Sequence, residues 1–497
     1  MDVTLDVVFE ISIVNIVKKS HEDLADVQSL VLGVVRFSRT IAIFDDAGDQ
    51  AHFSTYTLLA RLSASGIRGI ALAMKVLYYV GSWMRLNARL EEGRMINKRI
   101  FSALVAASAL VAGAQLAHAQ NQIVIGAIVP SSGPFAEWGR ANTVTLQMLE
   151  SEINKKGGVN GAKLKIMVLD DSAKPAQAAN DVRKLAGDDK VLAIAGPLTS
   201  TACEVAFPVA NQMKVVATSQ ASSKPGVAEA NRPWAFRNTV DEGVLTKASV
   251  PYFKKAFNIK KVAIIYDAKD AVSTAIATKI MPAVMKANDI DVLNAQKPIS
   301  FNTGDLDVSA QVTSLKALQP DGVVIGADYS QAITVIREMK RQGFTKPVIG
   351  GTPAISSAIL QAAPDIPIVA PATFYAGMSE PRAQKFVQDL QPLLRKASGL
   401  PKDVEPSMFD ANIYETVNMY VDAVKAAGVT GKPGDLEKDR EKIRDYIAKL
   451  KGFEGLAGPI AFNEHGDAVK RYFIVEGRNG AWTTKVRGCS VEGACGK

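Results

Sequence analysis

Histidine is scarce in this chain, and its scarcity excludes most catalytic sites. The 497 residues include four histidines, and three of them, His21, His52 and His118, lie within the first 120 residues. Beyond them stands His465 alone. Ser/His/Asp triads, histidine-rich zinc sites and metalloprotease helices all need histidines that the rest of the chain does not supply. We therefore interpret the protein as a non-enzyme and expect no catalytic residue and no metal site.

Cysteine is also rare, with three in the whole chain. Cys489 and Cys495 flank a short Ser/Gly-rich segment, and a disulfide between them suits an oxidising compartment. Such a small loop is worth only roughly 2–3 kcal/mol. Cys203 lies in an apolar, helix-like segment without a histidine to activate it, so an inert buried thiol is favoured over a nucleophile.

The glycine-rich loops that bind nucleotides are missing. No Gly-x-x-x-x-Gly-Lys-Ser/Thr loop occurs, so ATP hydrolysis is not expected of this chain. Residues 130–134, after the first apolar run of strand length, read Pro-Ser-Ser-Gly-Pro. A Rossmann-type enzyme needs Gly-x-Gly-x-x-Gly at that point and is kept only as an alternative. We expect no cofactor.

A large excess of one charge is lacking as well. The chain has 58 Lys and Arg against 50 Asp and Glu, a net charge of +8. Its basic pairs, such as Lys254-Lys255, are scattered among acids. This pattern is typical of a soluble mixed surface, and nucleic acid is not expected as a partner.

Long apolar runs are absent, but one short run has the features of a secretory signal. Residues 100–114 are apolar, too short for a stable membrane anchor, and follow the basic pair Lys98-Arg99. Ala117-His118-Ala119 supplies a small-x-small cleavage site. We predict a signal peptide over residues 95–120, a natural start at Met95 and a periplasmic protein beginning near Gln120. Residues 1–94 are then a non-native upstream extension.

From residue 122 onward, short β-branched runs alternate with longer amphipathic segments. This alternation predicts an α/β fold with parallel sheets flanked by helices. The expected strands are 123–129, 163–169, 191–195 and 215–218, and then 262–266, 291–293, 322–325 and 348–349. The expected helices are 175–185, 200–213, 273–287, 306–318, 331–342, 383–398, 409–427 and 442–450. Residues 459–462, 472–475 and 482–486 suggest a small antiparallel finish.

Two α/β series in tandem, followed by helices that must return to one of them, predict two similar lobes joined by several chain crossings. We assign residues 121–241 plus about 373–456 to the first lobe. The second lobe takes about 242–372 plus 457–490.

Several motifs in this region resemble one known family. Ser132-Gly133-Pro134-Phe135-Ala136-Glu137-Trp138-Gly139, Lys156-Gly157-Gly158-Val159-Asn160-Gly161 and Asp170-Asp171 stand in order after the first strand. Ala195-Gly196-Pro197-Leu198-Thr199-Ser200 and Phe409-Asp410-Ala411 continue the match. Their order and spacing are similar to those of the periplasmic leucine/isoleucine/valine-binding proteins, the receptors of ABC importers, over nearly all of residues 121–486.

The resemblance implies a hinge-bending, two-lobed protein of the type I periplasmic binding fold, with a ligand cleft between its lobes. The implied partners are a small carboxylated solute, an ABC permease and its ATPase subunits, and the implied state is a monomer that performs no chemistry. The solute would be similar to a branched-chain amino acid, or an aromatic or aliphatic carboxylate. A ligand-binding sensor domain of a receptor shares this fold and stays an alternative.

The resemblance also assigns ligand contacts in the first lobe. Thr199 and Ser200, at the start of a helix, would hold the solute carboxylate together with the free backbone N–H groups there. The competing interpretation is that Ser200 only caps the helix. Ala221 and Ser223 would complete the carboxylate and amine contacts, unless they form an ordinary Ser-rich turn. Trp138 would cover the solute side chain.

The second lobe departs from the family pattern. Ala271 stands where a tyrosine is usual, and Thr352 stands where an acid usually pairs with the solute ammonium. Asp328 and Tyr329, after the strand at 322–325, are the candidates to replace that acid. Without a replacement, burying an ammonium costs several kcal/mol. The pocket then suits a carboxylate without an amine, and des-amino acids are expected to bind at least as well as leucine or valine.

Overall fold

The computed structural model describes residues 6–15, 33–44, 50–61 and 122–495. The chain divides into two compact units, Met1–Gly113 and Ala114–Lys497. The predicted signal peptide at 95–120 lies outside the described residues. Within the described ranges, none of the helices combines the length and the apolar character that a membrane crossing needs.

The described part of the first unit is a three-stranded antiparallel sheet. Its strands are β1 (Asp6–Asn15), β2 (Gly33–Phe44) and β3 (Gln50–Arg61), in the order β1-β2-β3. They lie inside the segment that the sequence assigns to an upstream extension, and that assignment stays a prediction.

The second unit contains the first lobe, built on a five-stranded parallel sheet with the order β5-β4-β6-β7-β8. These strands are β4 (Gln122–Val129), β5 (Lys163–Asp170), β6 (Ala193–Ala195), β7 (Val216–Ser219) and β8 (Ala235–Arg237). The connecting helices are α3 (Ala136–Lys155), α4 (Pro175–Arg183) and α5 (Ser200–Gln212).

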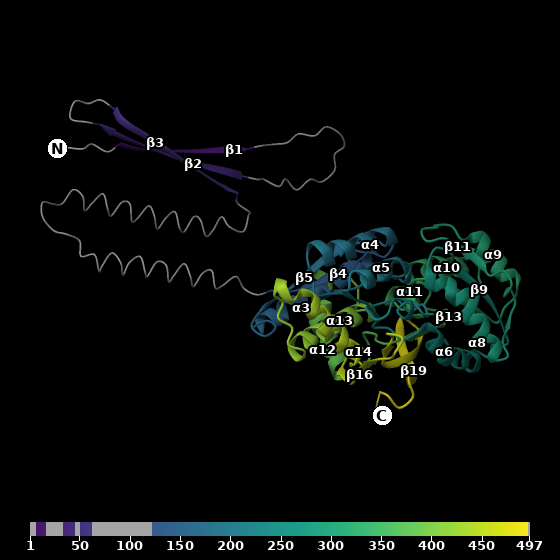
Figure 1. Ribbon diagram of the computed structural model, residues 1–497. Helices are drawn as coiled ribbons and strands as arrows, with labels where there is room; N and C mark the ends of the chain where they lie inside the picture. The colour runs from purple at the N-terminus through teal and green to yellow at the C-terminus, as the bar shows by residue number, and fades with distance from the viewer. Residues whose placement is uncertain (1–5, 16–32, 45–49, 62–121, 496–497) are drawn as a thin grey trace. The chain divides into compact units, whose positions relative to one another are not determined.

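Both faces of this sheet are covered by helices, as the continuous apolar run of β4 predicts. Ile123 and Ile125 point into a core with α3 and the late helices α13 (Met408–Ala426) and α14 (Leu436–Ala448). Ile128 points to the opposite face, where α4 and α5 pack. Figure 1 shows the early strands and the late helices, including α12 (Pro381–Lys396), in the same half of this unit.

The second lobe is built on an eight-stranded mixed sheet with the order β10-β9-β12-β13-β14-β18-β19, in which β11 also pairs with β9. The strands are β9 (Lys261–Asp267), β10 (Asp291–Val292), β11 (Ile299–Phe301), β12 (Gly322–Gly326), β13 (Val348–Gly350), β14 (Ile368–Ala372), β18 (Arg471–Arg478) and β19 (Ala481–Cys489). Its helices are α6 (Glu242–Phe257), α7 (Ala271–Ala275), α8 (Met281–Ala287), α9 (Ser309–Ala317), α10 (Tyr329–Arg341) and α11 (Ser357–Ala362).

The antiparallel finish of the chain is divided between the two lobes. The hairpin β18–β19 extends the second-lobe sheet, because β18 pairs antiparallel with β14. The preceding strands β15 (Phe453–Glu454), β16 (Pro459–Phe462) and β17 (Ala468–Val469) form a separate small sheet. Ile460, Phe462 and Ala468 belong to the first-lobe core. We therefore propose that the last crossing between the lobes lies near Lys470.

Candidate functional site

The two lobes touch where the carboxyl ends of their parallel strands face each other. The Thr201 hydroxyl oxygen accepts a hydrogen bond from the Ala271 backbone N–H, with 3.1 Å between oxygen and nitrogen. The hydroxyl oxygens of Ser223 and Thr352 are 3.1 Å apart. Ligands of open α/β sheets sit outside these strand ends. The candidate site therefore lies between these contacts.

The start of α5 is the part of the first lobe best suited to an anion. Thr199 is the N-cap, and its hydroxyl oxygen accepts from the Ala202 N–H at 3.1 Å. Within the described chain, the backbone N–H groups of Ser200 and Thr201 have no hydrogen-bond acceptor. Two free donors and the positive end of the helix dipole favour a carboxylate at this position.

Ser200 is not the cap of this helix, contrary to the competing interpretation of the sequence. Its hydroxyl lies 3.0 Å from that of Ser222, and both side chains are buried. Ser222 belongs to the loop after β7, where Ser219 accepts from the Ser222 N–H at 3.0 Å and donates to the Pro197 carbonyl at 2.7 Å. This serine-rich loop, which includes Ala221 and Ser223, is thereby folded onto the start of α5.

Trp138 packs against side chains of both lobes. Its ring centroid lies 4.9 Å from that of Tyr329 in the second lobe and 4.5 Å from that of Phe409 in the first. The Tyr329 hydroxyl donates to the Glu137 carboxylate, and burial raises the pKa of Glu137. The structure thus brings together two residues, Trp138 and Tyr329, that the sequence predicted separately.

A cavity of about 60 Å³ lies beside Trp138 and is lined by both lobes. Its walls include Ala141, Met408 and Asp410 from the first lobe and Ile355 and Trp482 from the second. Burial raises the pKa of Asp410 to about 6.

Asp328, in the second lobe, has one carboxylate oxygen with hydrogen-bond partners and one without. It caps α10 with one carboxylate oxygen, which accepts from the Ser330 N–H at 2.8 Å and the Ser330 hydroxyl at 2.6 Å. Its other oxygen, Oδ2, is buried and has no partner in the described chain. Burial is the main cause that raises the pKa of Asp328 to about 6. The hydrogen bonds from Ser330 oppose this rise, and the negative charge of the nearby Asp270 adds to it.

Asp270 lies in the same acidic region and reaches the first lobe. It caps α7, because its Oδ2 accepts from the Ser273 N–H at 2.9 Å and the Ser273 hydroxyl at 2.6 Å. The Thr201 hydroxyl also donates to this carboxylate, while burial raises its pKa. Asp270 therefore contacts the start of α5 from the second lobe, and Asp328 lies near enough to Asp270 for the two charges to interact.

Sequence reasoning missed a third buried acid, Glu242, at the first residue of α6. Its Oε1 accepts from the Thr352 N–H at 3.1 Å and its Oε2 from the Thr352 hydroxyl at 2.8 Å. The family usually has an acid at the position of Thr352. Here the Glu242 carboxyl group contacts Thr352 instead, and it comes from a different element, α6. Gly351 permits this approach, because a Cβ there would lie 2.6 Å from Glu242 Oε1. Burial raises the pKa of Glu242.

The cysteines are arranged as the sequence predicted. Cys489 and Cys495 form a disulfide. Cys203 is free and fully buried, and burial raises its pKa to about 12, which makes it an inert thiol. Among the residues that the structure describes, no group of three or more His, Cys, Asp or Glu side chains is arranged to hold a metal ion.

Comparisons with known proteins agree with this architecture. A family model described as periplasmic binding protein matches residues 122–481. The chain is 28% identical to an amino acid binding protein of Pseudomonas aeruginosa over 228 residues, which cover 46% of this chain and 60% of that relative. It is 26% identical to the leucine-, isoleucine-, valine-, threonine-, and alanine-binding protein of the same organism, covering 78% of this chain and 98% of the relative.

A solved structure shows the same fold. The branched-chain amino acid transporter substrate binding protein of Streptococcus pneumoniae, in complex with isoleucine, superposes with a TM-score of 0.64 and 24% identity. The match covers 74% of this chain and 99% of that structure. The α/β fold with two sheet-based lobes, predicted from the alternation of strands and helices, is thereby confirmed.

Proposed function

Since the chain belongs to the periplasmic binding protein family, we propose that it captures a small amino acid between its two lobes and delivers it to the permease of an ABC importer. It acts as a monomer, and the ATPase subunits of the importer supply the energy. It is located in the periplasm, to which the signal peptide at 95–120 directs its export. The exported protein is then expected to begin near Gln120, which N-terminal sequencing would check.

The unpaired Oδ2 of Asp328 is the observation that carries this proposal. A buried carboxylate oxygen without a partner is costly. A solute ammonium placed between Asp328 and Asp270 would offset that cost, because a cation strengthens hydrogen bonds to carboxylates. The same solute's carboxylate would lie at the free N–H groups of Ser200 and Thr201. A zwitterionic amino acid therefore complements both lobes at once.

The alternative solute is a carboxylate without an amine, such as an aromatic or branched aliphatic acid. It would use the start of α5 equally well but would leave the acids of the second lobe uncompensated. Thr352 in place of an acid was the reason to expect it. Glu242 against Thr352 and the free oxygen of Asp328 weaken that reason, since the second lobe does not lack buried carboxyl groups.

Calorimetry with matched pairs of solutes tests the proposal. Leucine and valine are compared with their des-amino counterparts, 4-methylpentanoate and 3-methylbutanoate, at pH 7.5. We expect the amino acids to bind at least about tenfold more tightly, which corresponds to about 1.4 kcal/mol. Asp328→Asn should remove most of that preference, because it deletes the negative charge and keeps a side chain that caps α10 well.

Asp307→Asn is the matched control. Asp307 is also an acid at a helix start of the second lobe, where it accepts from the Ser309 N–H at 2.9 Å, but it is exposed. This variant should keep the wild-type preference. Equal or tighter binding of the des-amino acids would exclude the ammonium site. Failure of every amino acid and carboxylate to bind would exclude the proposed function itself.

A further inference from the structure

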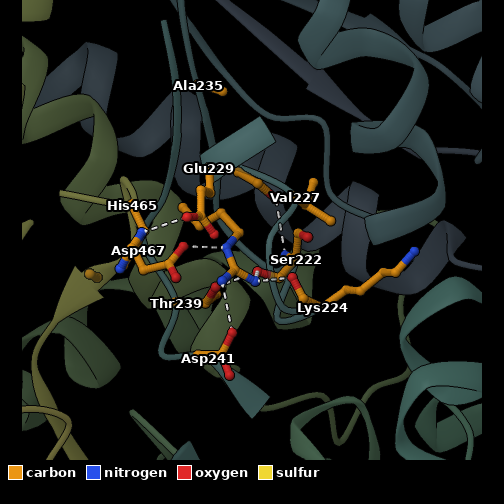
Figure 2. A network of polar contacts seen from close by, with 12 residues as sticks. Ser222, Lys224, Val227, Glu229, Ala235, Thr239, Asp241, His465 and Asp467 are labelled. Carbon is orange, nitrogen blue, oxygen red and sulfur yellow. Dashed lines mark hydrogen bonds and ion pairs between the residues drawn. The ribbon is translucent and has the colours of Figure 1, made fainter. Parts of the chain in front are cut away.

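Arg237 is a fully buried cation at the end of β8, where the chain leaves the first lobe. Figure 2 shows its surroundings: Ser222, Lys224, Asp241 and Asp467 approach one point from separate parts of the chain. We propose that Arg237 is a positioning residue for solute binding, which holds the serine-rich loop of the site in register with the start of α6 and with the β16–β17 turn, two segments that lie next to the proposed lobe crossings.

On one side, the guanidinium binds the start of α6 and the β16–β17 turn. Its Nε donates to Asp467 Oδ1 at 2.7 Å, just before the crossing near Lys470. One of its terminal nitrogens donates to Asp241 Oδ2 at 3.2 Å. Asp241 is the N-cap of α6, so this contact lies exactly where the second lobe begins. The Arg237 backbone N–H also donates to the Gly466 carbonyl at 2.8 Å.

On the other side, the guanidinium binds the loop. Its remaining terminal nitrogen donates to the backbone carbonyls of Ser222 and Lys224, which lie on both sides of Ser223. The Ser222 carbonyl accepts from the Thr239 hydroxyl as well. Because the Ser222 hydroxyl contacts that of Ser200, a single residue separates Arg237 from the candidate carboxylate site.

Arginine is suited to this position by its shape. The planar guanidinium has five N–H donors in a fixed fork, so it can bind two carboxylates and two carbonyls simultaneously. Its two carboxylate partners are on the start of α6 and on the β16–β17 turn, and its carbonyl partners are on the loop. A movement of the second lobe that shifts Asp241 is therefore transmitted to the loop through Arg237, which Asp467 holds in place, and a solute that orders the loop favours one arrangement of the lobes.

Lysine would keep the charge but has a single nitrogen on a flexible stem. Arg237→Lys is therefore expected to loosen the loop. The binding measurement that tests this rests on the proposed function, because it uses an amino acid as the solute. In calorimetry with leucine as the probe, we expect at least about tenfold weaker binding. Hydrogen exchange at the amides of Ala221 and Ser222 should become faster in the ligand-free protein, since both now donate to Ser219.

Arg440→Lys is the matched control, because Arg440 is also buried and also binds backbone carbonyls. Its guanidinium donates to the Val191 and Ala186 carbonyls in the first lobe, away from the loop. Both variants should lower the unfolding temperature, but only Arg237→Lys should change leucine affinity and loop exchange. Asp467→Asn, a milder change, should shift both readouts in the same direction.

A double-mutant cycle with Ser200→Ala separates positioning from general loss of stability. If Arg237 acts through the loop on the same contacts as Ser200, the two changes in binding free energy fall short of additivity. Full additivity, or loop exchange equal to that of Arg440→Lys, would overturn the inference. If wild-type protein does not bind leucine, the proposed function is in doubt, while loop exchange in the ligand-free protein still decides the role of Arg237.

Discussion

At the scale of single residues, the site combines donors without acceptors and acceptors without donors. Among the residues that the structure describes, the N–H groups of Ser200 and Thr201 have no acceptor on one lobe, and the Asp328 Oδ2 has no donor on the other. The sequence predicted Ser200 through the resemblance and Asp328 from its place after the strand at 322–325. It could not identify Glu242, because the contact with Thr352 joins residues 110 positions apart. The available signal was an acidic pair, Asp241-Glu242, at the predicted lobe boundary.

The raised pKa of Asp328 predicts how stability depends on pH. Its pKa is 3.8 when exposed and about 6 when buried, so the folded state binds the proton more tightly. The stabilisation is complete below about pH 4 and is lost as the pH rises through about 6. Asp328→Asn should therefore make the ligand-free protein more stable than wild type at pH 7.5, by up to ~3 kcal/mol.

Urea unfolding of both proteins between pH 4 and 7.5 measures this difference. The two stabilities should approach each other as the pH falls towards 4, because Asp328 is then protonated in the folded state and partly protonated in the unfolded state. Asp307→Asn should not show this gain, since the Ser309 hydrogen bonds lower the pKa of Asp307. A difference between wild type and Asp328→Asn that stays constant over this range would contradict the burial argument.

At the scale of elements, most of the helices and several short strands were predicted, but the 16-residue helix α6 and the strands β8, β11 and β14 were missed. The continuous apolar run of β4 and the amphipathic helices α10 and α13 have enough residues to show a period. The strands β8 and β14 were not predicted; runs of three and five buried residues are too short to show a period, so a strand of this length is identified or missed on composition alone. The predicted helix 273–287 is interrupted by a π-helical turn at Ile276–Ile280.

Thr199 and Ser200, at the start of α5, have different contacts, and we therefore expect their substitution to have different effects. Thr199 caps the helix, whereas the Ser200 hydroxyl faces Ser222. Ser200→Ala should weaken binding of every carboxylate solute by roughly 1–2 kcal/mol, the size of a hydrogen bond to a charged group, with little effect on unfolding. Thr199→Ala should instead lower stability by about 1 kcal/mol through the lost cap.

Calorimetry and thermal unfolding of the two variants distinguish these roles. If Ser200→Ala destabilised the protein as much as Thr199→Ala and left solute affinity unchanged, the hydroxyl would serve the helix rather than the solute.

At the scale of the second unit, of which the structure describes residues 122–495, direct contacts join the two lobes. Thr201 meets Ala271 and Asp270, Ser223 meets Thr352, and Trp138 packs on Tyr329. A solute between the lobes would add its own contacts to these and so favour the closed arrangement by its differential affinity.

Small-angle scattering with and without saturating leucine tests this closure. The radius of gyration should fall when leucine binds. Thr201→Val keeps the shape of the side chain but removes the hydroxyl that meets both Ala271 and Asp270. It should weaken leucine binding and make the fall less complete at a given concentration. An unchanged radius in the wild type at saturation would favour a rigid receptor.

The sequence alone determined the alternation of strands and helices, the two-lobed fold and the family, and it predicted solute contacts in the first lobe. These features follow from local patterns and motifs, which are formed by residues close together in the sequence. Only the tertiary structure decided which buried acids lie near the contacts between the lobes and how Arg237 joins the serine-rich loop to the start of α6 and the β16–β17 turn. Those arrangements depend on residues from distant segments, Asp467 among them, which packing of the two sheets brings within hydrogen-bond distance.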